Sequence, residues 1–352
     1  FNFSEKYILE KIDIRANFNI QTRDTAIIES ELISAIKSRM ISDVPISFLL
    51  SGGIDSSLIC YFAALDSKID TYFLGYESED KTFQDLSKHV SEKIDSDHTI
   101  IQMKQPIFAE ALNQMNDIFD EPFGDYSALP SYEIYKHISQ NTKVAISGDG
   151  ADEIFAGYKD SRLFLMRALL KMSDSYGIKD INQGLSKLFN SKSKINRYFG
   201  YLLSLLFLNE GALSLSTYRG GWNHSYRKIM MTDDGYNLTG GMDTENRESS
   251  IFMRSGENSI ERYLNYDMRR LTYDFLVKVD RTSMANSLEV RSPFLDTTLL
   301  KNLNEVNILN MVDHNQTKKE LKSILKMNGL GKVTKPKKQG FTPPLGLWMT
   351  SD

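Results

Sequence analysis

The 352-residue sequence contains one cysteine and no long hydrophobic run. A single cysteine excludes an internal disulfide framework and any multi-cysteine metal site. The longest uncharged apolar run, residues 198–208, is too short to cross a bilayer, and no signal-peptide pattern opens the sequence. There is no basic surplus either, because 42 basic residues face 46 acidic ones for a formal charge of −4. We therefore expect a soluble cytoplasmic protein that binds neither nucleic acid nor a membrane.

Apolar residues make up 41% of the sequence, which is a globular composition with enough material for a sizeable core. Over the first 150 residues, short apolar runs alternate with segments of helical periodicity. We expect strands at 44–50, 69–75, 98–103 and 143–147, and helices at 27–40, 56–65, 83–94, 106–118 and 129–140. This alternation predicts an α/β fold with a doubly wound parallel sheet. After Tyr158 the strand signals stop, and a largely helical C-terminal extension follows.

The strongest motif is Ser51-Gly52-Gly53-Ile54-Asp55-Ser56-Ser57, between a predicted strand and a predicted helix. Two glycines let the backbone turn tightly and approach a ligand, and the helix N-terminus directs N–H groups to the same point. With its serine hydroxyls, the loop predicts an anion cradle of phosphate size. It is neither the Walker loop nor the dinucleotide fingerprint, since the spacing fits neither. The plain alternative is a Gly-Gly turn with a serine cap.

A second loop, residues 145–153, ends the fourth predicted strand and contains Asp149, Asp152 and Glu153. Because the carboxyl ends of parallel strands share one edge of a sheet, both loops should face the same crevice. Acids beside an anion cradle would repel a triphosphate unless a cation lay between them. Mg²⁺ is commonly held by one or two carboxylates plus phosphate oxygens, so Asp55 and Asp152 are the predicted metal ligands. A solvated acidic turn is the alternative.

Four separated blocks, residues 50–57, 147–158, 280–296 and 338–341, occur together with a weaker fifth at 120–130. In this order they resemble the synthetase domain of the glutamine-hydrolysing asparagine synthetases. That family belongs to the ATP pyrophosphatase (PP-loop) superfamily and has an adenine nucleotide alpha-hydrolase-like fold. The resemblance implies a ligase that uses ATP and Mg²⁺. ATP adenylates a carboxylate with release of pyrophosphate, and ammonia then displaces AMP to leave an amide, with aspartate to asparagine as the first expectation.

The resemblance also implies which residues bind the nucleotide. The pyrophosphate set would be Ser51, Gly52, Gly53, Asp55 and Ser56, with Mg²⁺ on Asp55 and Asp152. The residues that match family contacts to the adenosine part are Leu49, Leu74, Ser147 and Gly148.

Catalytic and substrate residues follow from the same resemblance. Lys338 matches the lysine that stabilises the charge of the adenylation step. Asp149 stands where asparagine synthetases often have Glu and β-lactam-forming relatives have Tyr, which favours amidation by ammonia over ring closure. Asp274 would assist in catalysis. Glu289 and Arg291 would shape the substrate site, or would merely pair with each other.

Family members take ammonia from an N-terminal glutaminase domain with a cysteine nucleophile. The one cysteine here, Cys60, lies on the apolar helix after the phosphate loop, where a buried hydrophobic role is expected. The predicted partner is therefore a glutaminase domain upstream in the full-length protein or a separate ammonia-supplying subunit, besides the small carboxylate substrate. A homodimer is possible.

The expected domain organisation has four parts. Residues 1–24 are expected to be a linker from a missing glutaminase domain, and 25–158 the ATP-binding α/β core. Residues 159–258 would be a divergent helical or loop insertion, and 259–352 a truncated helical part that completes the synthetase site.

Several alternatives stay open at this point. The same chemistry could act on a sugar acid, a peptide side chain or a β-amino acid, because residues 159–258 carry no family motif. A non-catalytic nucleotide-binding scaffold is a different class of protein, against which the intact acids and Lys338 argue. Transfer to tRNA has no basic surface to recommend it. Substrate, ammonia source, oligomeric state and pathway are not determined by the sequence.

Overall fold

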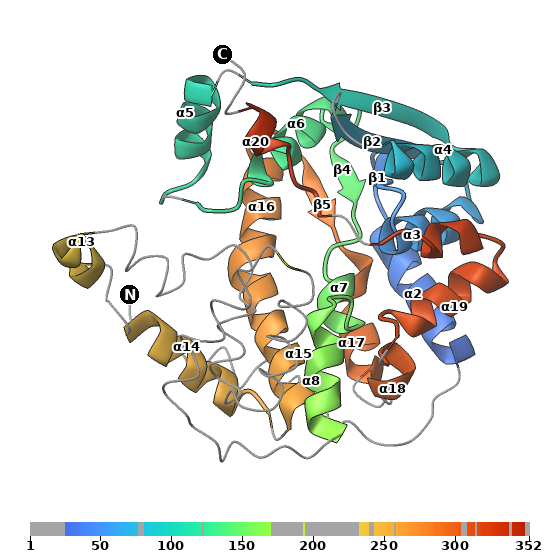
Figure 1. Ribbon diagram of the computed structural model, residues 1–352. Helices are drawn as coiled ribbons and strands as arrows, with labels where there is room; N and C mark the ends of the chain where they lie inside the picture. Colours follow the sequence, from blue (N-terminus) through green and yellow to red (C-terminus); the bar gives the residue numbers. More distant parts are fainter. Residues whose placement is uncertain are drawn as a thin grey trace. The chain divides into compact units, whose positions relative to one another are not determined.

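A five-stranded parallel sheet forms the centre of the computed structural model (Figure 1). Its strands are β1 (Ile46–Leu49), β2 (Asp70–Tyr76), β3 (Asp97–Met103), β4 (Val144–Ile146) and β5 (Glu289–Arg291), in the order β3-β2-β1-β4-β5. Every neighbouring pair is parallel. The structure describes residues 25–76, 81–106, 108–121, 123–169, 193, 232–238, 243–256, 258–303, 308–313, 315–337 and 340–348.

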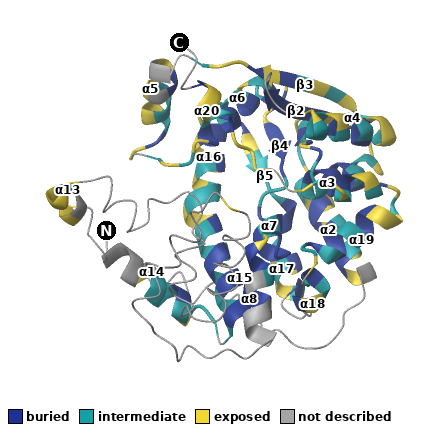
Figure 2. Cartoon of the chain, viewed as in Figure 1, coloured by how far each residue is buried: buried dark blue, intermediate teal, exposed yellow. Residues whose placement is uncertain are grey.

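The inner strands are apolar along their length because helices cover both faces of the sheet. β2 is buried from Thr71 to Tyr76, and all three residues of β4 are buried (Figure 2). Alternate residues of β2 therefore point to opposite layers. Tyr72, Leu74 and Tyr76 pack in one buried cluster with residues of the helices on their side.

Two helical layers enclose the sheet, as the doubly wound prediction requires (Figure 1). One layer contains α2 (Thr25–Arg39), α3 (Ile54–Ala64), α4 (Thr82–Ile94) and α19 (Lys319–Met327). The other contains α6 (Ala128–Ile138), which α5 (Phe108–Ile118) precedes, and α16 (Leu276–Met284). Tyr135 of α6 and Val279 of α16 join the buried cluster around Leu74. The predicted α/β fold class is thus confirmed.

The remaining elements are short or lie later in the chain. They are α7 (Ala151–Ile154), α8 (Asp160–Leu169), α13 (Asp233–Leu238), α14 (Asp243–Arg254), α15 (Ser259–Arg270), the π-helix η1 (Leu271–Phe275), the 3-10 helices η2 (Pro293–Leu295) and η3 (Gly331–Thr334), α17 (Thr297–Leu303), α18 (Ile308–Met311) and α20 (Leu345–Trp348). Among the described residues, no helix is both long and apolar enough to cross a membrane.

The fifth strand corrects the expectation that strands stop after Tyr158. β5 has three residues and one apolar side chain, Val290, so no periodic pattern announces it. It forms because β4 offers a free edge: Val144 pairs with Glu289 and Ile146 with Arg291. The expected helical or loop insertion, residues 159–258, contains α8, α13 and α14 in its described part. Residues 170–192, 194–231, 239–242 and 257 lie outside the described residues.

The chain divides into two units. One contains the sheet and consists of the described residues within 19–155, 269–311 and 318–352. In the other, Phe164 of α8 stacks on Tyr263 of α15 and packs beside Phe252 of α14. The sheet unit therefore combines residues 19–155 with two segments from the C-terminal part of the sequence. The expected linker, residues 1–24, lies outside the described residues.

Candidate active site

The two predicted loops follow adjacent strands at the point where the strand order reverses. β1 is flanked by β2 on one side and by β4 on the other, so the loops after β1 and β4 border the topological switch point of the sheet. Ligands of open α/β sheets bind in the crevice at such a point. The structure thus places two loops together: the phosphate loop, residues 51–57, and the acidic loop, residues 145–153.

The backbone conformation of the phosphate loop requires glycine at position 52. Its φ is +72°, and a Cβ atom there would lie 2.5 Å from the carbonyl oxygen of Phe83 and 2.9 Å from the backbone nitrogen of Ser87. The first turns of α4 therefore pack directly against the loop, and only glycine fits between them. Gly53 follows at the N-cap of α3 and has no side chain to occupy the N–H groups of the first turn. Those donors suit an anion.

Serine hydroxyls hold the loop in shape. The Ser51 and Ser56 hydroxyls are 2.9 Å apart, and the backbone N–H of Ser51 donates to Ser56 Oγ at 3.1 Å. Both serines were predicted to contact pyrophosphate. In the structure they bridge the strand end and the first turn of α3, which fixes the backbone that would cradle the anion.

The acidic loop touches the phosphate loop at Gly148. A Cβ atom at this glycine would lie 3.1 Å from Asp55 Cβ and 3.2 Å from the backbone nitrogen of Ser56. The Ser147 hydroxyl donates to Asp149 Oδ2 at 2.7 Å and lies 3.1 Å from Ser292 Oγ. Asp149 is therefore oriented from within its own loop and, through Ser147, from the segment after β5.

A buried lysine that the sequence did not indicate joins the two loops. Lys318 Nζ contacts Asp55 Oδ1 and Oδ2 at 2.7 and 2.6 Å and Asp152 Oδ1 at 2.7 Å. Burial alone would lower the pKa of Lys318, but the charges of Asp152 and Asp55 outweigh it and raise the pKa above its ordinary value. Lys318 also has a left-handed φ of +52°, a costly conformation for a residue with a side chain.

The same pair of carboxylates fits the predicted magnesium ligands. Asp55 and Asp152 come from different loops, yet both reach the Lys318 ammonium, so their oxygens converge on one region. The described residues contain no cluster of three or more metal-ligating side chains. Two convergent carboxylates are nevertheless the usual protein share of a Mg²⁺ site completed by phosphate oxygens and water.

The two further catalytic candidates in the described region lie on different elements. Burial raises the pKa of the Tyr135 phenol in α6, and the charge of nearby Asp149 raises it further. Asp274 lies in η1, where its Oδ2 is 3.7 Å from Arg270 Nε. Such π-helical turns occur frequently at functional sites.

The structure places the predicted substrate pair at the sheet edge. Arg291 Nε donates to Glu289 Oε1 at 2.7 Å, and Arg291 Nη1 donates to the carbonyl oxygens of Arg39 and Ile41 at 2.9 and 2.7 Å. Arg39 is the last residue of α2 and Ile41 lies two residues beyond it, so the guanidinium caps the end of that helix. The arrangement favours the alternative that Glu289 and Arg291 pair with each other. Together they line a hollow of about 440 Å³ with Lys143.

The remaining candidates are less informative. Leu74 is buried in the cluster on one face of the sheet, and Leu49 is half-buried against the same cluster. Leu49 is the last residue of β1, the central strand, and Leu74 lies on the neighbouring strand β2. Lys338 lies outside the described residues.

The fold and loops define an α/β protein with a glycine-containing, phosphate-type loop at the topological switch point of a parallel sheet. Residues 28–352 match the family model for asparagine synthase. The chain therefore belongs to the asparagine synthase family, which is a family of ATP-using ligases.

Two curated asparagine synthetases agree with this assignment. Asparagine synthetase [glutamine-hydrolyzing] 1 of Bacillus subtilis is 28% identical over 97% of this chain and 54% of its own length. A putative asparagine synthetase of Methanocaldococcus jannaschii is 30% identical over 72% of this chain and 48% of its own length. The chain spans about half the length of these relatives. A solved NMN synthetase from Francisella tularensis aligns with 76% of this chain and 98% of its own at 13% identity and a TM-score of 0.32.

Proposed function

We propose that this chain catalyses the ATP-dependent amidation of a carboxylate through an acyl-adenylate, with aspartate as the acceptor. A carboxylate oxygen of the acceptor attacks the α-phosphorus of ATP, and pyrophosphate leaves. Ammonia then attacks the carbonyl carbon, loses a proton, and displaces AMP to form the amide. The observation that supports this most directly is the convergence of Asp55 and Asp152 on one point beside the phosphate loop.

The phosphate loop would bind and orient the triphosphate. The backbone N–H group of Gly52 and the N-terminus of α3 would supply donors that need no reorganisation when pyrophosphate charge develops. Mg²⁺, when bound to Asp55 and Asp152, would neutralise phosphate oxygens and align the leaving group. Lys318 already lies between these carboxylates and would add a second positive charge near the pyrophosphate.

The second step would use the carboxylates of Asp149 and Asp274. Ser147 orients Asp149, which could accept the proton that ammonia loses when it attacks. Asp274 would assist it, and Lys338 would stabilise the adenylation step. Ammonia would come from glutamine, through a glutaminase domain in the full-length protein or a separate subunit. The Bacillus subtilis relative is named as glutamine-hydrolysing, which supports this source.

The test is to incubate the chain with Mg-ATP, ammonium chloride and aspartate, and to measure pyrophosphate and asparagine together. We expect both products in equal amounts. Asp55→Asn should lower turnover about 100-fold, because a metal carboxylate contributes several kcal/mol to transition-state stabilisation. Unchanged turnover in this variant would contradict the metal role of Asp55.

A second candidate keeps the chemistry and changes the acceptor. Residues 159–258 carry no motif of the family, and that divergence is the observation that favours a different carboxylate. In that case, incubation of the chain and Mg-ATP with a sugar acid, a β-amino acid or an acidic peptide would release pyrophosphate, whereas incubation with aspartate would not. Binding of ATP with no pyrophosphate from any acceptor would instead favour a non-catalytic scaffold.

A further inference from the structure

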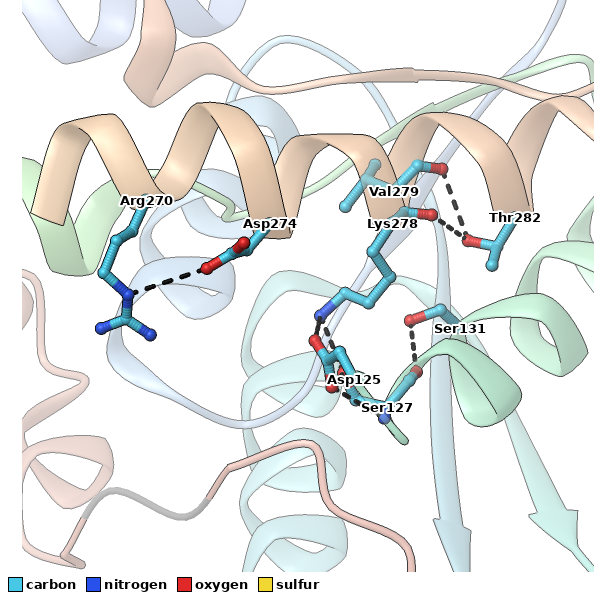
Figure 3. A network of polar contacts seen from close by, with 8 residues as sticks. All are labelled: Asp125, Ser127, Ser131, Arg270, Asp274, Lys278, Val279 and Thr282. Carbon is cyan, nitrogen blue, oxygen red and sulfur yellow. Dashed lines mark hydrogen bonds and ion pairs between the residues drawn. The ribbon is translucent and has the colours of Figure 1, made fainter. Parts of the chain in front are cut away.

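A polar network outside the two loops ties α16 to the segment before α6 (Figure 3). Lys278 Nζ donates to Asp125 Oδ2 at 2.9 Å and to Ser127 Oγ at 2.8 Å. Ser127 in turn donates to Asp125 Oδ1 twice, from its backbone nitrogen at 2.9 Å and its hydroxyl at 2.6 Å. The ammonium is thus held by two acceptors that also hold each other.

The network is well shielded from water. The side chain of Lys278 is 12% exposed and that of Asp125 is 26% exposed. Burial alone would raise the pKa of Asp125, but the Lys278 charge and the hydrogen bonds from Ser127 outweigh it and lower the pKa below its usual value. The Lys278 ammonium also lies 5.2 Å from the ring centroid of Phe275, a cation–π distance.

The position of Lys278 along its helix makes this network relevant to Asp274. Arg270, Asp274 and Lys278 are spaced by four residues, and Figure 3 shows all three side chains on one side of the helix. An acid followed four residues later by a lysine forms a favourable ion pair on a helix. Lys278 instead bends to Asp125 and Ser127, while Arg270 Nε stays 3.7 Å from Asp274 Oδ2.

We propose that Asp125 and Ser127 are positioning residues that hold Lys278 away from Asp274. Without them, the ammonium of Lys278 would turn to the neighbouring carboxylate and neutralise it. Asp274 would then assist proton removal by Asp149 in the amidation step less effectively. This inference rests on the proposed function for the consequence in catalysis, although the contacts themselves are independent of it.

The test compares Asp125→Asn with the double variant Asp125→Asn/Lys278→Met. In Asp125→Asn we expect amidation to fall between about tenfold and 100-fold, with pyrophosphate formation in the absence of ammonia unchanged. The acid limb of the pH–rate profile should move to lower pH, because the charges facing Asp274 would become Arg270 and Lys278 together. The double variant should recover rate and profile, since the displaced ammonium is then missing.

Asp120→Asn is the matched control. Asp120 comes from the same segment and pairs with Arg281 of α16, but its side chain is 79% exposed. We expect this variant to behave like the wild type. If Asp125→Asn does not fold, Ser127→Ala removes one of the two acceptors, and the same shift should appear with a smaller size.

Three results would overturn the inference. They are an unchanged profile in both Asp125→Asn and Ser127→Ala, a double variant no faster than Asp125→Asn, and a Lys278→Met variant as slow as Asp274→Asn. A ¹³C NMR titration of the labelled Asp274 carboxyl, assigned by its loss in Asp274→Asn, reports the same displacement without turnover. Wild-type amidation by Asp274→Asn would refute the proposed role of Asp274, while this titration still decides where Lys278 points.

Discussion

Lys318 brings one positive charge to two carboxylates from different loops. Its side chain is 5% exposed, whereas those of Asp55 and Asp152 are 21% and 17% exposed, so the ammonium depends on these two carboxylates for compensation of its charge. Buried ion pairs add little compared with apolar packing, but removal of one partner leaves charge uncompensated and is strongly destabilising.

We therefore expect Lys318→Met to lower the free energy of unfolding by about 3–5 kcal/mol. Denaturant titration measures the loss. Lys326→Met, at an exposed position of α19, the helix that Lys318 caps, is the control and should stay within about 0.5 kcal/mol of the wild type. A loss below about 1 kcal/mol in Lys318→Met would mean that the two aspartates tolerate each other without the lysine.

The two adjacent glycines of the phosphate loop should differ in their tolerance of alanine. Gly52 has φ +72° and no space for a Cβ, whereas Gly53 is extended and its nearest neighbour would be Ser51 Oγ at 3.3 Å. Left-handed backbone alone costs an ordinary residue about 1–2 kcal/mol. Gly52→Ala should lose at least that much stability, measured by denaturation, and Gly53→Ala clearly less. Equal losses would contradict the assigned geometry.

At the scale of elements, α16 is joined to the segment before α6 by an inner ion pair, Lys278–Asp125, and an outer one, Arg281–Asp120. The inner pair is shielded and hydrogen-bonded from several sides, so it should contribute to stability, whereas the outer pair should contribute little. Comparing variants of the two pairs therefore distinguishes an ion pair that attaches α16 to the rest of the sheet unit from one that only places charges on the surface.

This difference predicts a pH dependence. Folding lowers the pKa of Asp125, so the native state binds fewer protons than the unfolded chain. The contribution of Asp125 is then fully present above about pH 4 and is lost as the pH falls further. The stability gap between wild type and Asp125→Asn should be on the order of 2 kcal/mol at pH 7. It should shrink below pH 4 in urea titrations.

At the scale of the whole molecule, ligand binding to the native state should raise the melting temperature. Mg-ATP at 100 times its Kd would add about 2.7 kcal/mol. If Asp55 and Asp152 hold the metal, ATP with EDTA should stabilise less, and Asp55→Asn should remove the difference. Differential scanning fluorimetry measures this shift. Equal stabilisation with and without Mg²⁺ in the wild type would argue against a metal on these residues.

Local pattern was sufficient for most elements of the sheet unit. The strand at 69–75 and the helix at 83–94 were predicted almost to the residue, because apolar runs and helical periodicity are strong signals there. β5 escaped, since three residues with one apolar side chain carry no period. The role of Lys318 could not be predicted from the sequence either. A lysine beside Lys319 at a helix start is indistinguishable in sequence from a solvated one.

The sequence by itself determined the α/β class, the phosphate loop and the acidic loop, because glycine spacing and strand-to-helix junctions are local properties. Only the tertiary structure decided what those loops meet. It brought Lys318 between Asp55 and Asp152, turned Arg291 to the end of α2, and bent Lys278 to Asp125. Each of these contacts joins residues far apart in the sequence, and the energy that selects them depends on burial and on the distance between charges. Neither quantity exists before the chain folds.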